Sequence, residues 1–200
     1  RFGGAPDTCD GDHSCIRRSG CPSLSIKTTA DPLRSDPVAT VLDSCVGCGL
    51  CEKVCPVLNP LALPHAPTAW AAWTGDDDSR MASTSGGVFP ELAREILRQG
   101  GAVFGAAYDE QFRVVHICAE KEQDLNRLRG AKYAQSDLTG IFTEVKNRLD
   151  AGQKVLFSGT PCQVLGLKAF LRKEYDDLLT ADLVCHSVPS PLAWEKYLQY

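Results

Sequence analysis

The sequence predicts an α+β chain in which a small cysteine-rich N-terminal domain is joined to a larger α/β domain. Two observations predict this division. Seven of the ten cysteines fall within residues 9–55, a stretch rich in Gly, Pro and Asp and poor in helical periodicity. From residue 69 onward, strand-like and helix-like segments alternate, as they do in layered α/β structures. We therefore expect one domain at residues 1–57, a proline-rich linker at 58–68 and an α/β domain at 69–200.

The composition is that of a globular protein with a hydrophobic core. Hydrophobic residues make up 44% of the chain and charged residues 23%. The net charge of −4 and the scattered basic residues argue against nucleic acid as the main partner. The apolar runs are strand-sized, well short of the ~20 residues that a bilayer-spanning helix needs, so we expect no membrane span.

In the N-terminal domain, residues 24–26 and 38–42 are expected to form short strands. The turn-forming pairs Asp31-Pro32 and Asp36-Pro37 lie between them. This domain is too small to build a core of its own, so a bound metal must hold it together.

In the α/β domain, most strands and helices are bounded by glycine or proline signals. The helix expected at 86–99 has Val88, Leu92, Ile96 and Leu97 at roughly helical spacing and stops at Gly100-Gly101. The expected strands are 69–73, 102–108, 113–119, 154–157 and 180–185, with 102–108 and 113–119 pairing as a hairpin. The other expected helices are 122–128, 139–150 (with Ile141, Phe142, Val145 and Leu149 inward), 163–172 and 191–200.

The run from Cys45 to Pro56 has the spacing C-x2-C-x2-C-x3-C-P, with which bacterial ferredoxins hold iron–sulfur clusters. Its ligands are Cys45, Cys48, Cys51 and Cys55. In this spacing three thiolates bind one cluster, and the fourth, before the proline, binds a second. Zinc is the alternative, but zinc sites usually combine two separated C-x2-C pairs, and no second pair occurs here at that spacing. The run therefore predicts two 4Fe-4S clusters, held in a reducing compartment such as the cytoplasm.

An incomplete second run precedes the first. Cys9 and Cys15 are six residues apart, as are the first and third ligands of the intact run, and Cys21-Pro22 matches its last ligand. The missing second ligand falls at Asp12, whose carboxylate binds iron more weakly than a thiolate, so this corner would be labile and easily lost to leave a 3Fe-4S cluster. His13 is the alternative ligand, and Asp12 as a simple turn residue is the other interpretation. The crossover rule assigns Cys9, Asp12, Cys15 and Cys55 to one cluster, and Cys45, Cys48, Cys51 and Cys21 to the other.

Residues 9–23, together with 31–34 and 36–42, resemble the ferredoxin-like end of the indolepyruvate ferredoxin oxidoreductase alpha subunit. The resemblance extends to about Cys51. That family uses thiamine diphosphate, but its thiamine-binding part is absent from this chain, so the resemblance implies only electron transfer.

Three stretches of the second domain place polar residues where α/β proteins bind ligands. Residues 83–89 gather hydroxyls and glycines at a helix N-terminus, which favours a phosphate, although a plain helix cap would look the same. Residues 157–163 run from a buried strand into a helix and place Cys162 at its start, where a thiol has a lowered pKa and could serve as ligand, nucleophile or flavin contact. Residues 182–191 follow the end of a strand, where open α/β sheets bind ligands.

The order of these stretches resembles the family of coenzyme F-420 hydrogenase and dehydrogenase beta subunits over residues 48–200. The resemblance rests on residues 48–57, 85–89, 129–136, 158–163 and 185–191. Members of that family look like iron–sulfur flavoproteins that bind FAD. The resemblance implies cofactor-binding roles for Ser85, Gly86, Gly87, Lys132, Tyr133, Gln135, Ser136, Ser158, Gly159, Thr160, Cys162 and Gln163.

The chain departs from the family pattern in places. Ser187 stands where the family usually has glycine, and Pro90 where a small polar residue is more common. The family also normally continues well beyond Tyr200, so the resemblance implies an α/β domain longer than residues 69–200.

The resemblance implies an oxidoreductase subunit in which FAD passes electrons between a two-electron carrier, deazaflavin F-420 or a similar molecule, and the clusters, which relay them to a partner protein. The alternative is a ferredoxin-type electron-transfer module without catalysis of its own. A structural zinc protein is a third possibility.

Overall fold

The computed structural model describes residues 24–28, 37–53, 58, 67–189 and 191–200. Near the N-terminus, β1 (Leu24–Thr28) and β2 (Pro37–Val41) pair as an antiparallel hairpin, with Leu24 opposite Val41. Both predicted N-terminal strands are confirmed. A single helical turn, α2 (Leu50–Lys53), lies within the cysteine run.

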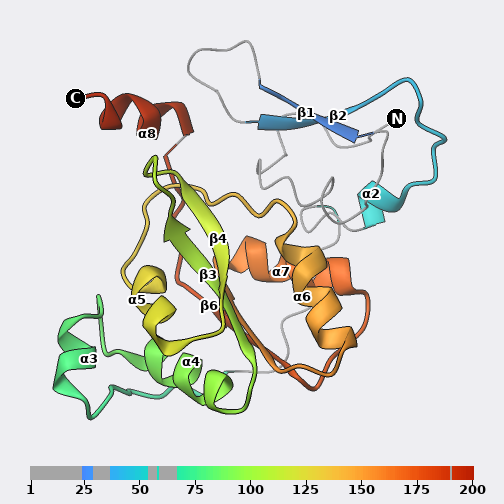
Figure 1. Cartoon of the computed structure of the whole chain (residues 1–200). Helices are drawn as coiled ribbons and strands as arrows, with labels where there is room; N and C mark the ends of the chain where they lie inside the picture. Colours follow the sequence, from blue (N-terminus) through green and yellow to red (C-terminus); the bar gives the residue numbers. More distant parts are fainter. Residues whose placement is uncertain (1–23, 29–36, 54–57, 59–66, 190) are drawn as a thin grey trace.

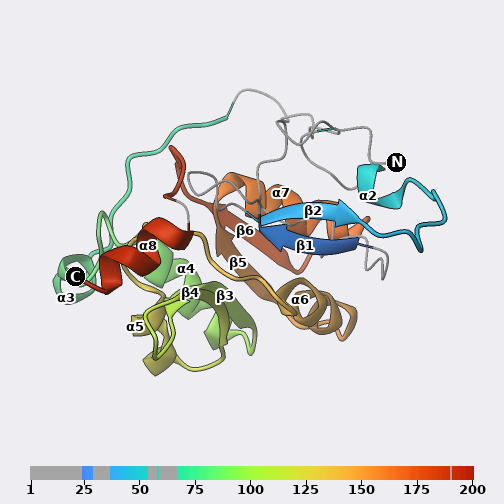
Figure 2. The same ribbon diagram turned by 90° about the horizontal axis from the view of Figure 1, so that it is seen from above.

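The main sheet has four strands in the order β4-β3-β5-β6, as Figure 2 shows from above. The strands β3 (Ala102–Tyr108) and β4 (Val114–Ala119) form the predicted antiparallel hairpin. The strands β5 (Val155–Gly159) and β6 (Leu178–Asp182) run parallel to β3 and to each other. The helix α7 (Pro161–Leu171) crosses between β5 and β6, as a parallel pair requires.

Helices cover both faces of this sheet (Figure 1). On one face lie α4 (Val88–Arg98) and α5 (Leu125–Leu128), the latter preceded by the 3-10 turn Glu122–Asp124. On the other lie α6 (Ile141–Asp150) and α7. Because side chains alternate along a strand, Phe104 of β3 packs with α6 and α7 while the neighbouring Val103 packs with α4 and α5. The sheet is therefore buried on both sides, which confirms the predicted α/β architecture of this part.

The strand predicted at residues 69–73 is wrong. The segment has no strand partner, and its tryptophans are largely exposed, Trp70 at 84% and Trp73 at 66%. Its end is joined to the start of α4 instead, where the Thr74 N–H donates to the Gly86 carbonyl at 2.7 Å. The short helix α3 (Asp77–Met81) that follows was not predicted, although Asp76 caps it by accepting from the Ser79 N–H.

The boundaries of several elements differ from the prediction by one to three residues. α7 begins at Pro161, two residues early, because Thr160 and Gln163 form a capping box around its first turn. β6 also begins two residues early, at Leu178, and ends at Asp182.

The last helix, α8 (Pro191–Leu198), is held to the β3–β4 hairpin by Trp194. Its ring stacks on Tyr108 with centroids 6.1 Å apart, and its indole N–H donates to the Phe112 carbonyl. Among the residues that the structure describes, no helix is long and apolar enough to cross a membrane.

Candidate functional site

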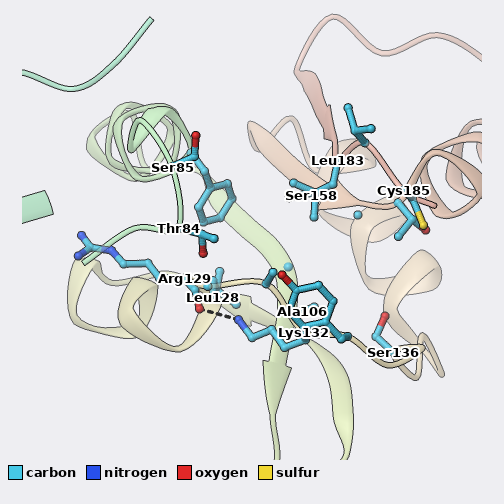
Figure 3. Close-up of a pocket in the computed structure, with 18 of the residues that line it drawn as sticks. Thr84, Ser85, Ala106, Leu128, Arg129, Lys132, Ser136, Ser158, Leu183 and Cys185 are labelled. Atoms are coloured by element: carbon cyan, nitrogen blue, oxygen red, sulfur yellow. Dashed lines mark hydrogen bonds between the residues drawn. The ribbon is translucent and has the colours of Figure 1, made fainter. Parts of the chain in front are cut away.

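A cavity of about 850 Å³ lies where the ends of β5 and β6 meet the N-termini of α4 and α7 (Figure 3). Its floor includes Gly105 and Ala106 of β3, and one wall is formed by residues 183–185 and 187–189, which follow β6. The structure brings together at this cavity all of the residues that the sequence pointed to for a cofactor: Ser85, Gly86, Gly87, Lys132, Tyr133, Gln135, Ser136, Ser158, Gly159, Thr160, Cys162 and Gln163.

Two glycines let the chain approach closely at the start of α4. Gly87 is the N-cap and has φ +73°, a left-handed conformation that favours glycine. A Cβ on Gly87 would lie 2.6 Å from Cγ2 of Thr74, and a Cβ on Gly86 would lie 2.7 Å from the Ala72 carbonyl oxygen. Larger residues would therefore push apart the segments that form this end of the cavity, where the N-terminus of an eleven-residue helix is available for an anion.

Lys132 places an amino group in the cavity. Its Nζ donates to the carbonyl oxygens of Arg129 at 2.8 Å and Arg127 at 3.1 Å (Figure 3). The side chain is half-buried, and this burial lowers the pKa of Lys132 to about 8.

The charged side chains of the cavity are all positive among the described residues that line it. Among the described residues that line it, Lys132 and Arg129 are the charged ones, and no Asp or Glu is present. The Arg129 side chain extends away from Lys132 in Figure 3 and donates to Ser79 Oγ at 3.4 Å, while its buried Nε has no hydrogen-bond partner. The cavity therefore favours a ligand with negative charge.

A chain of hydrogen bonds supports the opposite end of the cavity, and its centre, His116, was missed in the sequence. The imidazole of His116, 5% exposed, lies 2.8 Å from Ser136 Oγ through Nδ1 and 3.0 Å from the Ser158 carbonyl oxygen through Nε2. Gln163 Nε2 donates to the same Ser136 hydroxyl at 2.8 Å, and Gln163 Oε1 accepts from the Thr160 N–H at 2.9 Å. A histidine among the apolar residues of β4 was the available signal, but its partners lie 20 and 42 residues away in the sequence.

Backbone strain is present in the loop after β6. Ser187 lines the cavity and has φ +111°, a conformation that L side chains rarely adopt. The resemblance placed glycine at this position in related proteins, and the strained φ gives a physical reason.

We expect the Ser187→Gly variant to be more stable than the wild type by about 1 kcal/mol, because glycine adopts a positive φ without strain. Chemical denaturation measures this free energy of unfolding. The control Val188→Gly changes the next residue, which is not among those with positive φ, and should lower stability. Equal losses in both variants would contradict the prediction.

Only two of the predicted iron ligands have described side chains. Cys45 and Cys48 are both exposed, and the glycines after them, Gly47 and Gly49, each have φ +69°. The Gly47 N–H donates to Cys45 Sγ at 3.4 Å. The backbone of Cys51 is described but its side chain is not, and Cys9, Asp12, Cys15, Cys21 and Cys55 lie outside the described residues.

Known protein families match one segment of the cysteine-rich part and one segment of the α/β part of the chain. Residues 152–200 match the family described as the C terminus of the coenzyme F420 hydrogenase/dehydrogenase beta subunit, and residues 39–58 match the 4Fe-4S binding domain family. The F subunit of the F(420)H(2) dehydrogenase of Methanosarcina mazei is 22% identical over 121 residues, covering 60% of this chain and 34% of that protein. A chain in the solved structure of the F420-reducing NiFe hydrogenase complex from Methanosarcina barkeri has a TM-score of 0.51 and 19% identity, covering 64% of this chain and 47% of that chain.

These matches confirm the resemblance to the family of F420 hydrogenase and dehydrogenase beta subunits and the presence of a 4Fe-4S binding motif. The chain spans about a third of the curated relative's length. The likeness to the solved structure concerns the fold.

Proposed function

We propose that this chain, which carries the pattern of F420 hydrogenase and dehydrogenase beta subunits at residues 152–200, is an iron–sulfur flavoprotein subunit of an oxidoreductase. It exchanges electrons between a two-electron carrier, deazaflavin F-420 or a similar molecule, and a partner protein, through FAD and 4Fe-4S clusters. The observation that carries the proposal is that the Ser85, Lys132 and Thr160 stretches line one cavity together with the cationic residues Lys132 and Arg129.

The cavity residues fit FAD. Its volume of about 850 Å³ lies within the range of about 300–1,000 Å³ that is usual for small-molecule sites. FAD carries a pyrophosphate, and the glycines and helix N-terminus at α4 together with Lys132 would hold it. No acidic residue among the described lining residues opposes that charge.

Bound FAD supplies the conversion between hydride transfer and single-electron transfer. The chain's own residues bind and orient it. The positive end of α7 and the ammonium of Lys132 stabilise negative charge in the cavity.

The clusters belong to the N-terminal part. We assign Cys45, Cys48, Cys51 and Cys21 to one 4Fe-4S cluster and Cys9, Asp12, Cys15 and Cys55 to a second, and the 4Fe-4S family match at residues 39–58 supports the first. In this proposal the clusters pass electrons between FAD and a partner protein.

We expect the weak carboxylate corner at Asp12 to make the second cluster labile. The oxidised protein should show a three-iron signal in electron paramagnetic resonance, and added iron should convert it to a four-iron cluster. The Asp12→Cys variant should lose the three-iron signal, because a thiolate holds the fourth iron more firmly. A three-iron signal that iron cannot convert would contradict ligation by Asp12.

An absorbance spectrum of the full-length protein, purified without oxygen, tests the function. FAD and clusters together should give flavin peaks at roughly 375 and 450 nm above broad absorption near roughly 400 nm. Broad absorption alone, with no FAD released by acid, would support the ferredoxin-type module instead. A colourless protein with stoichiometric zinc would contradict both.

FAD affinity should depend on the charge of Lys132. Because its pKa is about 8, the amine is mostly protonated at neutral pH and loses its charge as the pH rises above that value. We therefore expect affinity for FAD to fall by about tenfold as the pH rises from about 7 to about 9, as a charge-assisted hydrogen bond is lost.

Titration of apoprotein with FAD at several pH values measures this fall. The Lys132→Met variant should bind weakly at every pH and lose the pH dependence. Lys168→Met, which changes an exposed lysine of α7 outside the cavity, should behave like the wild type. A pH dependence that survives in Lys132→Met would assign the effect to another group.

A further inference from the structure

The hydrogen bonds around His116 have a defined direction. A carbonyl oxygen only accepts, so the bond between His116 Nε2 and the Ser158 carbonyl requires a hydrogen on Nε2. In the neutral ring, Nδ1 then carries a lone pair and accepts the hydroxyl hydrogen of Ser136. The ring also stacks on Phe157, with centroids 5.3 Å apart, which holds it in this orientation.

These bonds use most of the hydrogen-bonding capacity of the Ser136 hydroxyl. Its hydroxyl has one hydrogen, which goes to His116, and two lone pairs, one of which accepts from Gln163 Nε2 at 2.8 Å. Gln163 cannot turn its amide around, because its Oε1 accepts from the Thr160 N–H. The one hydrogen-bonding position left on Ser136 is a lone pair, on a residue that lines the cavity and is 8% exposed.

The backbone around Ser136 keeps it in place. Residues 114–116 and 137 form a bridge in which the His116 N–H donates to the Asp137 carbonyl and the Asp137 N–H donates to the Val114 carbonyl, both at 2.9 Å. The segment that carries Ser136 therefore pairs with the edge of β4. This pairing places Ser136 beside His116 of β4. The Ser136 hydroxyl could still rotate about its C–O bond, and its hydrogen bond to His116 prevents that rotation.

We propose that His116 is a positioning residue that makes Ser136 a hydrogen-bond acceptor toward the cavity, so that the site selects a ligand with an N–H donor at this end. The inference rests on the proposed function and adds an orientation to it. The ligand's anionic groups lie near Lys132 and α4, and an N–H-bearing ring edge lies at Ser136. In FAD that edge is the imide N–H of the isoalloxazine ring.

The test compares FAD with its N3-methyl analogue, in which that imide hydrogen is replaced by a methyl group. The dissociation constants of both ligands are measured for the wild type, Ser136→Ala and His116→Phe, starting from apoprotein whose clusters are intact. His116→Phe keeps a ring to stack on Phe157 but removes both nitrogens. Thermal unfolding checks that each variant is folded.

We expect the wild type to bind FAD at least about tenfold more tightly than the analogue, because a site built to pair with a donor rejects a ligand that lacks it. Ser136→Ala should weaken FAD binding and reduce the preference to less than about threefold. His116→Phe should also reduce the preference, since the freed hydroxyl can rotate toward the ligand. The ratio of two affinities is insensitive to a general loss of stability, and Ser136→Ala keeps the test decisive if His116→Phe does not fold.

Nitrogen chemical shifts of His116, measured by NMR, provide a readout without ligand. A neutral ring with its hydrogen on Nε2 supports the proposal, whereas a hydrogen on Nδ1 overturns it. Equal binding of FAD and the analogue by the wild type would overturn the inference and leave the proposed function intact. Failure of the wild type to bind FAD at all would overturn both.

Discussion

Replacing Cys48 by serine is expected to remove about half of the iron from the purified protein, that is, about four iron atoms per chain if two 4Fe-4S clusters are present. Cys48 is an exposed residue in the centre of the matched 4Fe-4S motif, between two left-handed glycines that bend the backbone around it. Serine oxygen is a poorer iron ligand than thiolate sulfur. Iron analysis and the electron paramagnetic resonance of the reduced protein measure the loss.

The matched control is Cys118→Ser. Cys118 lies in β4, and burial raises the pKa of its thiol to about 11, so that at neutral pH it is a thiol rather than the thiolate that metals bind. This variant should keep all of its iron. Equal iron in both variants and the wild type would exclude the run from 45 to 55 as a cluster site.

Replacing Gly87 by valine should abolish FAD binding, with an affinity loss of more than about 100-fold, while leaving the iron content unchanged. A valine at φ +73° is strained, and its Cβ would lie 2.6 Å from Cγ2 of Thr74. Relief of that contact must move Thr74 or the start of α4, and either movement displaces Gly86 and Gly87 at this end of the cavity. FAD titration and iron analysis of the same preparation measure the two effects separately.

Gly140→Val is the control for backbone strain. Gly140 is also a helix N-cap, with φ +78°, and a Cβ there would meet nothing within 4 Å. The cost of placing valine at a positive φ, on the order of 1–3 kcal/mol, should be similar in the two variants. Gly140 lies outside the cavity, so its variant should leave FAD affinity unchanged. Equal FAD affinities in the two variants would show that Gly86, Gly87 and the start of α4 do not hold the ligand.

Most of the α/β layer could be predicted because local patterns and tertiary packing agree. The four residues expected on the inner face of α6, namely Ile141, Phe142, Val145 and Leu149, are all buried. The hairpin of β3 and β4 was predicted from two apolar runs separated by Asp109-Glu110, and Asp109 indeed closes the turn by accepting from the N–H groups of Gln111 and Arg113. Such short-range signals need no knowledge of distant residues.

The helix α4 shows where the pattern was misleading. Of its large apolar residues, Val88 and Leu92 are 41% and 37% exposed, while the small Ala93 is fully buried. Close packing of α4 on the sheet favours a small residue at the contact, and hydrophobicity alone does not reveal which face is nearest to the sheet. The strand predicted at 69–73 was wrong for a different reason, because its apolar residues have no strand to pair with.

The residues of the candidate site could be nominated from the sequence because they lie in short motifs at the starts of helices and the ends of strands. Their assembly into one cavity follows from the parallel pair β5 and β6, whose carboxyl ends lie at one edge of the sheet. His116 could not be found in this way. Its role depends on a ring orientation and on two partners from other segments, which only the folded chain brings within hydrogen-bonding distance.

The cavity is lined by residues from 72 to 189. It therefore closes only after the hairpin, the segments that connect β4 to β5 and β5 to β6, and the loop beyond β6 are in place. The β3–β4 hairpin can form early, since its strands are neighbours in the chain, whereas pairing of β3 with β5 requires closure of a loop of about fifty residues. A ligand that binds here recognises the completed domain and not its parts. Its binding energy therefore adds to the stability of the whole α/β layer, and a cell short of that ligand would accumulate the less stable form of the protein.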